Sequence, residues 1–197
     1  MGIAIPLALG LLVFWGVSLR NTLMHKEPSQ PPSPGFPMSL WPLLVGAGSL
    51  AMFAEALALI AGDVTGSVQV PLDALTTLGL AGFVAGCVLH AWSVETRGRY
   101  ATSWSMGSNH KLITWGPYGL VRHPSYLAYF LMIIGVTLVW RRWFTLLPWA
   151  AIPGYVVISR IEEEMLVNKF RDQYRNYMRR VGAFTPKLRL RNTQAPQ

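Results

Sequence analysis

The sequence has little cysteine and little charge. Its single cysteine, Cys87, excludes an internal disulfide and a zinc cluster of several cysteines, and its place in an apolar run argues against a nucleophilic thiol. Charged residues make up 13% of the 197 residues, 52% are hydrophobic, and the mean hydropathy is +0.34. Soluble domains carry about 25% charged residues. The composition therefore predicts an integral membrane protein.

A glycine-rich dinucleotide fingerprint is also missing. No GxGxxG follows a strand-like pattern and no βαβ unit is evident, so a nucleotide cofactor cannot be bound in the Rossmann manner. Acidic residues are scarce, since 9 aspartates and glutamates stand against 17 lysines and arginines, for a net charge of +8. The basic residues flank apolar runs, where cations anchor helices at anionic headgroups. We therefore expect membrane lipids as partners and no nucleic acid.

What the chain does have is apolar runs. A hydrocarbon core about 30 Å thick needs roughly 20 helical residues, and three runs approach or reach that length, at 3–19, 41–61 and 71–92. The first lacks a basic start and a convincing cleavage site, so we expect it to be a retained helix. Two shorter runs, 126–140 and 143–159, are joined only by Arg141-Arg142. The predicted fold class is an all-α integral membrane protein with about five transmembrane helices, the last two forming a helical hairpin.

Three regions follow from this pattern. Residues 1–70 hold the first two spans and a proline-rich linker at 28–37, residues 71–190 hold the other spans, and 191–197 is expected to be a disordered tail. The region 71–190 also includes a polar loop at 93–125 and a C-terminal helix at 160–182. Threading five spans leaves only Arg141 and Arg142 opposite the other basic residues near span ends. The positive-inside rule makes the loop and the C-terminal helix cytoplasmic.

The end of the polar loop is dense in functional residue types. The segment 110–126, HKLITWGPYGLVRHPSY, holds two histidines, a lysine, an arginine and a glycine turn. Turn residues at 116–119 let the backbone approach a ligand closely, and Pro124 suits the first turn of the next helix, whose amides would accept a carboxylate. Taken singly, these residues are as well explained by snorkelling, capping or an interfacial aromatic belt. Together they favour a ligand-binding loop.

A second polar cluster, Glu162-Glu163-Glu164, begins where the last apolar run ends. Two histidines and a glutamate could ligate a metal, but the spacing of His110 and His123 matches no zinc signature, so we predict no metal. A further glutamate, Glu55, lies in the middle of a span, where it must be protonated, paired or facing a polar cavity.

In combination these motifs resemble the isoprenylcysteine carboxyl methyltransferase family, whose wider relatives are the membrane phospholipid methyltransferases. The resemblance covers roughly residues 85–188 and rests on Gly116-Pro117-Tyr118, Arg122-His123-Pro124-Ser125-Tyr126, Glu162-Glu163, Leu166, Phe170, Tyr174 and Tyr177. It implies S-adenosyl-L-methionine as cofactor, with S-adenosyl-L-homocysteine as product. It also implies methyl transfer to a lipid or lipidated acceptor, in first place the C-terminal carboxylate of an isoprenylcysteine-like substrate, at the cytoplasmic membrane face.

The resemblance and the residue chemistry suggest roles. We expect Arg122 to clamp the acceptor carboxylate through a bidentate pair. Successive helix positions diverge by about 100°, so not every glutamate faces one ligand, and we rank Glu163 before Glu162 as the carboxylate at the cofactor. The other expected cofactor-binding residues are His110, Lys111, Leu112, Gly116, Pro117, Tyr118, His123, Pro124 and Tyr126. The chain departs from the family at Arg171, where glycine is frequent.

Other functions stay open. An NADPH-dependent sterol-type reductase carries a comparable Arg-His-x-x-Tyr element, but a 2′-phosphate would call for more arginines and no neighbouring carboxylate triplet. A phospholipid amine methyltransferase would use the same cofactor with a different acceptor. A non-catalytic membrane scaffold is the least favoured alternative. The sequence determines neither the acceptor nor the oligomeric state.

Overall fold

The computed structural model of the chain describes residues 2–24, 40–100 and 110–187. The proline-rich linker at 28–37, the tail at 191–197 and part of the loop at 93–125 lie outside these residues. In the described part the regular structure is helical except for one isolated bridge. The elements are α1 (Ala4–Met24), α2 (Leu40–Thr65), α3 (Ala74–Arg97), η1 (Gly116–Gly119), α4 (Pro124–Trp140), η2 (Trp143–Ala150), α5 (Ala151–Phe170) and α6 (Asp172–Arg180).

Four of the helical segments are long and apolar enough to cross a membrane. They are α1, α2, α3 and the continuous stretch of η2 and α5 from Trp143 to Phe170, whereas α4 is a shorter apolar helix of 17 residues. Their outer surfaces carry large exposed hydrophobic side chains such as Leu12, Leu43 and Leu50, each about 70% exposed. This confirms an all-α, multi-pass membrane protein. A bilayer crossing by all five segments and the cytoplasmic side of the loop stay predictions.

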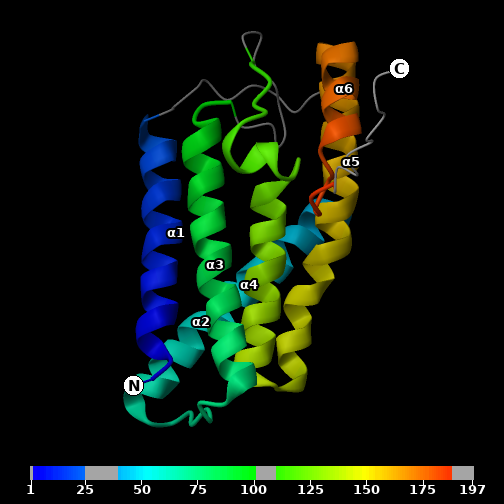
Figure 1. The fold of residues 1–197 in the computed structure, drawn as a ribbon. Helices are drawn as coiled ribbons and strands as arrows, with labels where there is room; N and C mark the ends of the chain where they lie inside the picture. Colours follow the sequence, from blue (N-terminus) through cyan, green and yellow to red (C-terminus); the bar gives the residue numbers. More distant parts are fainter. Residues whose placement is uncertain (1, 25–39, 101–109, 188–197) are drawn as a thin grey trace, which may run out of the picture.

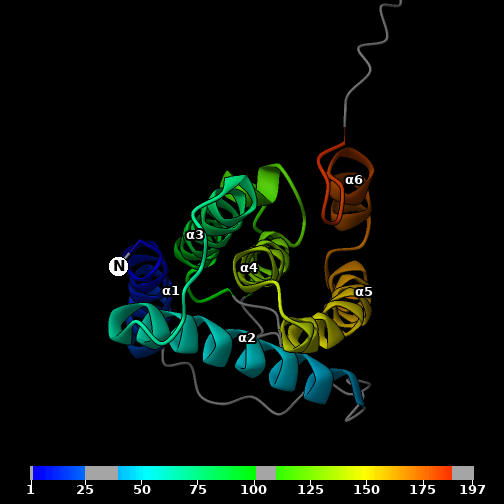
Figure 2. The same ribbon diagram turned by 90° about the horizontal axis from the view of Figure 1, so that it is seen from below.

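Glycines bring the central helices close together. The backbone of α3 approaches that of α4 so closely that a Cβ atom added at Gly79 would lie 2.7 Å from the carbonyl oxygen of Gly135. The same distance separates a Cβ at Gly86 from the carbonyl oxygen of Ala128. Small residues allow this approach where helices cannot rely on a hydrophobic driving force. α1 stands beside α3, and α2 crosses obliquely against α1 and α5, as Figures 1 and 2 show.

One end of the α3–α4 pair is tied by an ion pair. The side chain of Asp73 accepts a hydrogen bond from the backbone N–H of Thr76, which caps the first turn of α3. The same carboxylate lies 2.6 Å from Nη1 of Arg141 at the end of α4. This end lies opposite the loop at 110–123 (Figure 1). This ion pair therefore fixes the register of the two helices at that end.

The hairpin and the C-terminal helix differ from the prediction. The expected helix at 143–159 begins as the 3-10 segment η2 with Pro148 inside it, and becomes α-helical only at Ala151. Proline cannot donate the backbone hydrogen bond that a continuous α-helix needs there. The prediction of a single helix over 160–182 is wrong. Two helices occupy this region, because Arg171 adopts φ 46° and ψ −121°, which ends α5 at Phe170 and lets α6 start at Asp172.

Candidate active site

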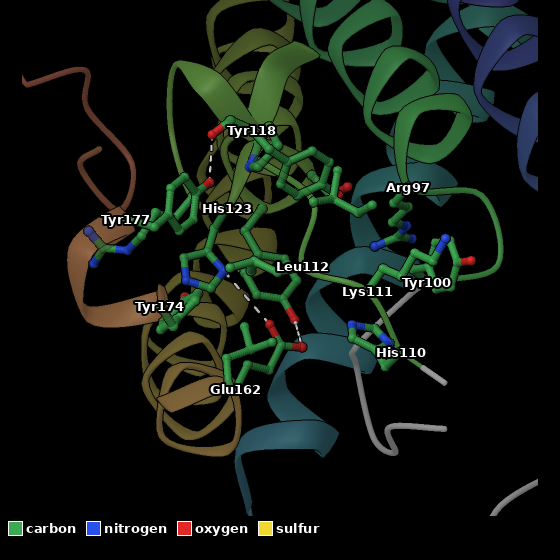
Figure 3. Close-up of a pocket in the computed structure, with 16 residues that line it drawn as sticks. Arg97, Tyr100, His110, Lys111, Leu112, Tyr118, His123, Glu162, Tyr174 and Tyr177 are labelled. Atoms are coloured by element: carbon green, nitrogen blue, oxygen red, sulfur yellow. Dashed lines mark hydrogen bonds and ion pairs between the residues drawn. The ribbon is translucent and has the colours of Figure 1, made fainter. Parts of the chain in front are cut away.

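A cavity lies at the loop end of the helix bundle, where the loop, the start of α4, the end of α5 and α6 meet (Figure 3). Its empty space is about 610 Å³, a value that includes the open mouth. The residues that line it come from two stretches that are far apart in the sequence, 97–126 and 162–177. They are Arg97, Tyr100, His110, Lys111, Leu112, Ile113, Tyr118, Arg122, His123, Pro124, Ser125, Tyr126, Glu162, Leu166, Tyr174 and Tyr177.

The glutamates of α5 point in different directions. Glu162 lines the cavity, is 6% exposed, and accepts a hydrogen bond of 2.6 Å from the hydroxyl of Tyr126. Glu163 is absent from the cavity wall, and Glu164 is exposed. The step of about 100° between neighbouring helix positions produces this division. The structure therefore places Glu162 at the cavity, although we had ranked Glu163 first.

Glu163 is held by the Arg-His motif. Its Oε1 atom lies 2.8 Å from Nε and 2.8 Å from Nη2 of Arg122. Nε2 of His123 lies 2.9 Å from the same oxygen, and because a carboxylate only accepts, this nitrogen donates. Nδ1 of His123 faces the other glutamate, 3.7 Å from Oε2 of Glu162. His123 therefore forms the wall between the two carboxylates.

The guanidinium of Arg122 is used by the protein itself. Besides Glu163, its Nη1 donates to the backbone carbonyls of Val181 at 2.5 Å and Met178 at 3.4 Å. The backbone N–H groups of Arg122 and His123 donate to residues 182 and 183, next to the bridge between residues 121 and 182. Arg122 thus ties the loop to α5 and to the segment after α6. With these donors occupied, the geometry does not favour the predicted clamp on an acceptor carboxylate.

Tyrosines form the wall near α6. The hydroxyl of Tyr177 donates to the backbone carbonyl of Tyr118 at 2.5 Å, which joins α6 to η1. Tyr174 is 1% exposed and packs beside Tyr177. Burial raises the pKa of the hydroxyls of Tyr118, Tyr174 and Tyr177, so all three stay neutral at physiological pH. This wall offers flat aromatic surface with no negative charge.

Two residues predicted at the cofactor lie behind this wall. Gly116, with φ 60°, packs against α3, where an added Cβ atom would come within 3.0 Å of Thr96. Pro117 is buried in η1, and neither residue is among those that line the cavity. The turn therefore sets the position of Tyr118, and direct cofactor contact by these two residues stays a prediction.

The facing wall carries the basic groups. Figure 3 shows Arg97, Tyr100, Lys111 and His110 across the cavity from the side of Glu162. Burial, together with the smaller effect of the charge of Lys169, lowers the pKa of His110 to about 4. His110 is therefore a neutral imidazole at physiological pH.

Among the charged residues that line the cavity, Arg97 is the one that the sequence did not reveal. It ends α3 and lines the cavity, and its Nε atom is buried with no hydrogen-bond partner in the part of the chain that the structure describes. Arginines at the ends of spanning helices are ordinary headgroup anchors, so nothing in the sequence singled this one out. Its position next to the loop of the Arg-His motif was visible only in the fold.

The wall chemistry is complementary to a ligand with three features. A buried carboxylate favours a cation, a buried guanidinium donor favours an anion, and tyrosine faces favour a planar ring or a cation. Among the described residues, no group of three or more histidine, cysteine or acidic side chains is placed to hold a metal ion. The cavity is therefore suited to a zwitterionic molecule with an aromatic part.

Several known proteins are similar to more than half of this chain. Protein-S-isoprenylcysteine O-methyltransferase of Tribolium castaneum is 32% identical over 123 residues, which cover 57% of this chain and 42% of that protein. Protein-S-isoprenylcysteine O-methyltransferase B of Arabidopsis thaliana is 28% identical over 117 residues, 57% of this chain and 59% of that protein. The nickel-cobalt-cadmium resistance protein NccN of Alcaligenes xylosoxydans xylosoxydans is 31% identical over 125 residues, 59% of this chain and 52% of that protein. The chain thus spans about half the length of the curated relatives it matches.

The sequence model of the family described as phospholipid methyltransferase matches residues 74–173, from the start of α3 to the first residues of α6. This match takes in half of the chain and includes the RHPSY motif and all three glutamates of α5. The chain therefore belongs to the phospholipid methyltransferase family of membrane methyltransferases, to which its resemblance to the isoprenylcysteine carboxyl methyltransferases pointed.

Proposed function

We propose that the protein transfers a methyl group from S-adenosyl-L-methionine to a lipid-linked acceptor at the cytoplasmic membrane face. The acceptor we favour is the C-terminal carboxylate of an isoprenylcysteine-like substrate. One observation carries the proposal: in a chain of this family, the buried carboxylate of Glu162 faces a cavity whose other walls include tyrosines and basic side chains. The names of the relatives in Tribolium and Arabidopsis support the choice of acceptor.

The residues present fit this cofactor. S-Adenosyl-L-methionine supplies, when bound, a sulfonium methyl group that passes to the acceptor oxygen while the S–C electron pair stays on sulfur, leaving S-adenosyl-L-homocysteine. Glu162 is the carboxylate placed to attract its cationic groups, and Tyr126 orients Glu162 by donating to Oε1. The tyrosine wall can cover the adenine and attract a sulfonium through its π faces. Glu163 is left to support the wall because Arg122 and His123 already occupy its Oε1.

A carboxylate acceptor asks little acid–base chemistry of these residues. Carboxylates are ionised at neutral pH, so no general base is needed. The buried side chains around Glu162 keep water away from the reacting groups. In a dry site the approach of a negative oxygen to a positive methyl donor is favoured over separated solvated ions. The chain therefore acts by holding two reactants in line and by excluding water.

Binding and turnover test this function separately. Isothermal titration of the detergent-solubilised protein with S-adenosyl-L-homocysteine and with NADPH should give micromolar binding of the first alone. Transfer of a labelled methyl group to N-acetyl-S-farnesylcysteine should exceed transfer to phosphatidylethanolamine vesicles. Preferred methylation of the vesicles would instead indicate a phospholipid amine methyltransferase. Binding of NADPH alone would indicate a sterol-type reductase, and binding of neither compound would refute enzymatic function at this cavity.

A further inference from the structure

Arg97 presents an unused donor toward the cavity. Among the residues that the structure describes, its Nε atom is buried and has no acceptor. A buried donor without a partner is unfavourable, and more so when the group is charged, so such a group in a cavity wall calls for an anionic ligand. Arg122, by contrast, has its Nε and Nη2 on Glu163 and its Nη1 on backbone carbonyls. The two arginines of the wall thus differ in what they can still bind.

The surroundings of Arg97 connect the cavity to the membrane boundary. Arg97, Tyr100 and Ile113 line the cavity and also a second hollow on its outer side, to which Arg99 and Trp115 belong. Trp115 is 57% exposed, as expected of a tryptophan at a membrane interface. Arg97 also ends a helix long enough to span the bilayer. A headgroup tethered to a lipid can reach this level without leaving the membrane surface.

Arg97 is close to the groups proposed to hold the cofactor. Its positive charge acts on the carboxylate of Glu162 and on the hydroxyl of Tyr126. A ligand on Arg97 would therefore lie beside the cofactor rather than in a separate chamber. Lys111, which is exposed on the loop and lines the same cavity, remains as a second cation for the cofactor's own carboxylate.

We infer that Arg97 binds the carboxylate of the acceptor and so selects an anionic, lipid-linked substrate. The inference rests on the proposed function and replaces the clamp role that the sequence suggested for Arg122. Nε and one terminal nitrogen of a guanidinium form an edge that matches the two oxygens of a carboxylate, which lysine and glutamine reproduce poorly. Arg97 is a positioning and specificity residue, and it leaves the methyl donor's binding to other side chains.

A comparison of two competitors tests this role. N-acetyl-S-farnesylcysteine and its carboxamide differ only in the charged group, and binding of each is measured by inhibition of methyl transfer to a labelled acceptor. Wild type should prefer the carboxylate by about 10- to 100-fold, the range expected for hydrogen bonds to a charged group. Arg97→Gln should reduce this preference to about threefold or less. Arg97→Lys should fall between the two, because it keeps the charge and loses the fork.

Cofactor binding separates the possible outcomes. The dissociation constant for S-adenosyl-L-homocysteine should change by less than about threefold in both Arg97 variants, which also shows that their cavity is folded. Arg175→Gln is the matched control, since Arg175 is a 58% exposed arginine on α6, and it should leave all three constants unchanged. If Arg97→Gln lost affinity for S-adenosyl-L-homocysteine together with its preference for the carboxylate, Arg97 would lie at the cofactor and the inference would be overturned. A preference for the carboxylate that survives Arg97→Gln would overturn it as well. If wild type itself neither binds this product nor transfers methyl groups, the proposed function fails first.

Discussion

Glu162→Gln and Glu163→Gln should impair different properties of the protein, although the two substitutions are chemically identical and adjacent in the sequence. Glu163 is paired with Arg122 and His123. The side chain of Glu163 is only 13% exposed, and that of Arg122 is 10% exposed. Glu162 accepts from Tyr126, and its Oε2 lies 3.7 Å from Nδ1 of His123. We therefore expect Glu163→Gln to impair folding and Glu162→Gln to impair cofactor binding.

The magnitudes follow from the contacts. Breaking a buried pair costs about 3–5 kcal/mol, and since glutamine still accepts one hydrogen bond from Arg122, about 2–4 kcal/mol is expected for Glu163→Gln. At about 2–4 °C per kcal/mol for a chain of this size, its unfolding temperature should fall by about 5–15 °C. Glu162→Gln keeps an acceptor for Tyr126 and removes a buried charge, so its unfolding temperature should change by less than about 2 °C. Its affinity for S-adenosyl-L-homocysteine should fall about 10- to 100-fold, through the lost hydrogen bond to a charged group.

Thermal unfolding and isothermal titration of the same detergent-solubilised preparations measure both effects. Any loss of affinity in Glu163→Gln should be recovered when titration is carried out well below its lowered unfolding temperature. The reasoning is refuted if Glu163→Gln loses affinity at full thermal stability while Glu162→Gln binds normally. That result would restore Glu163 as the carboxylate at the cofactor.

The other predictions concern the backbone strain at Arg171 and the neutral imidazole of His110. Arg171→Gly should raise the unfolding temperature by about 2–12 °C, because φ 46° and ψ −121° strain any residue with a Cβ atom by about 1–3 kcal/mol. Arg171→Ala, which keeps the Cβ atom, should bring no gain, and an equal gain would trace the effect to the lost side chain. For His110, burial and the charge of Lys169 lower the pKa from 6.5 unfolded to about 4 folded. Between pH 6.5 and 4 the unfolded chain binds a proton that the folded chain does not bind. The free energy of unfolding therefore decreases as the pH is lowered through this window. His110→Gln should flatten this decline, and an unchanged slope of unfolding temperature against pH would contradict it.

The apolar runs determined the helices to within a few residues. α1, α2 and α3 begin within three residues of the starts of the runs at 3–19, 41–61 and 71–92 and continue four or five residues past their ends, because backbone hydrogen bonds continue through polar residues at a helix terminus. Local composition cannot show a break that depends on one backbone angle. Arg171 is ordinary in sequence, apart from the resemblance in which glycine is frequent, yet its positive φ divides α5 from α6. Pro148 did announce a local disturbance, and η2 is its outcome.

The sequence by itself also predicted that the loop at 110–126 and the glutamates of α5 belong to one site, because threading five spans places both motifs at the same membrane boundary. Only the tertiary structure decided the division of roles within it. Which of Glu162 and Glu163 faces the cavity depends on the rotation of α5 about its axis, and packing around Gly154 and Tyr155 sets that rotation. Arg97 entered the site for the same reason. Side-chain partners across helices arise from how whole helices pack, and a single sequence carries no local record of that packing.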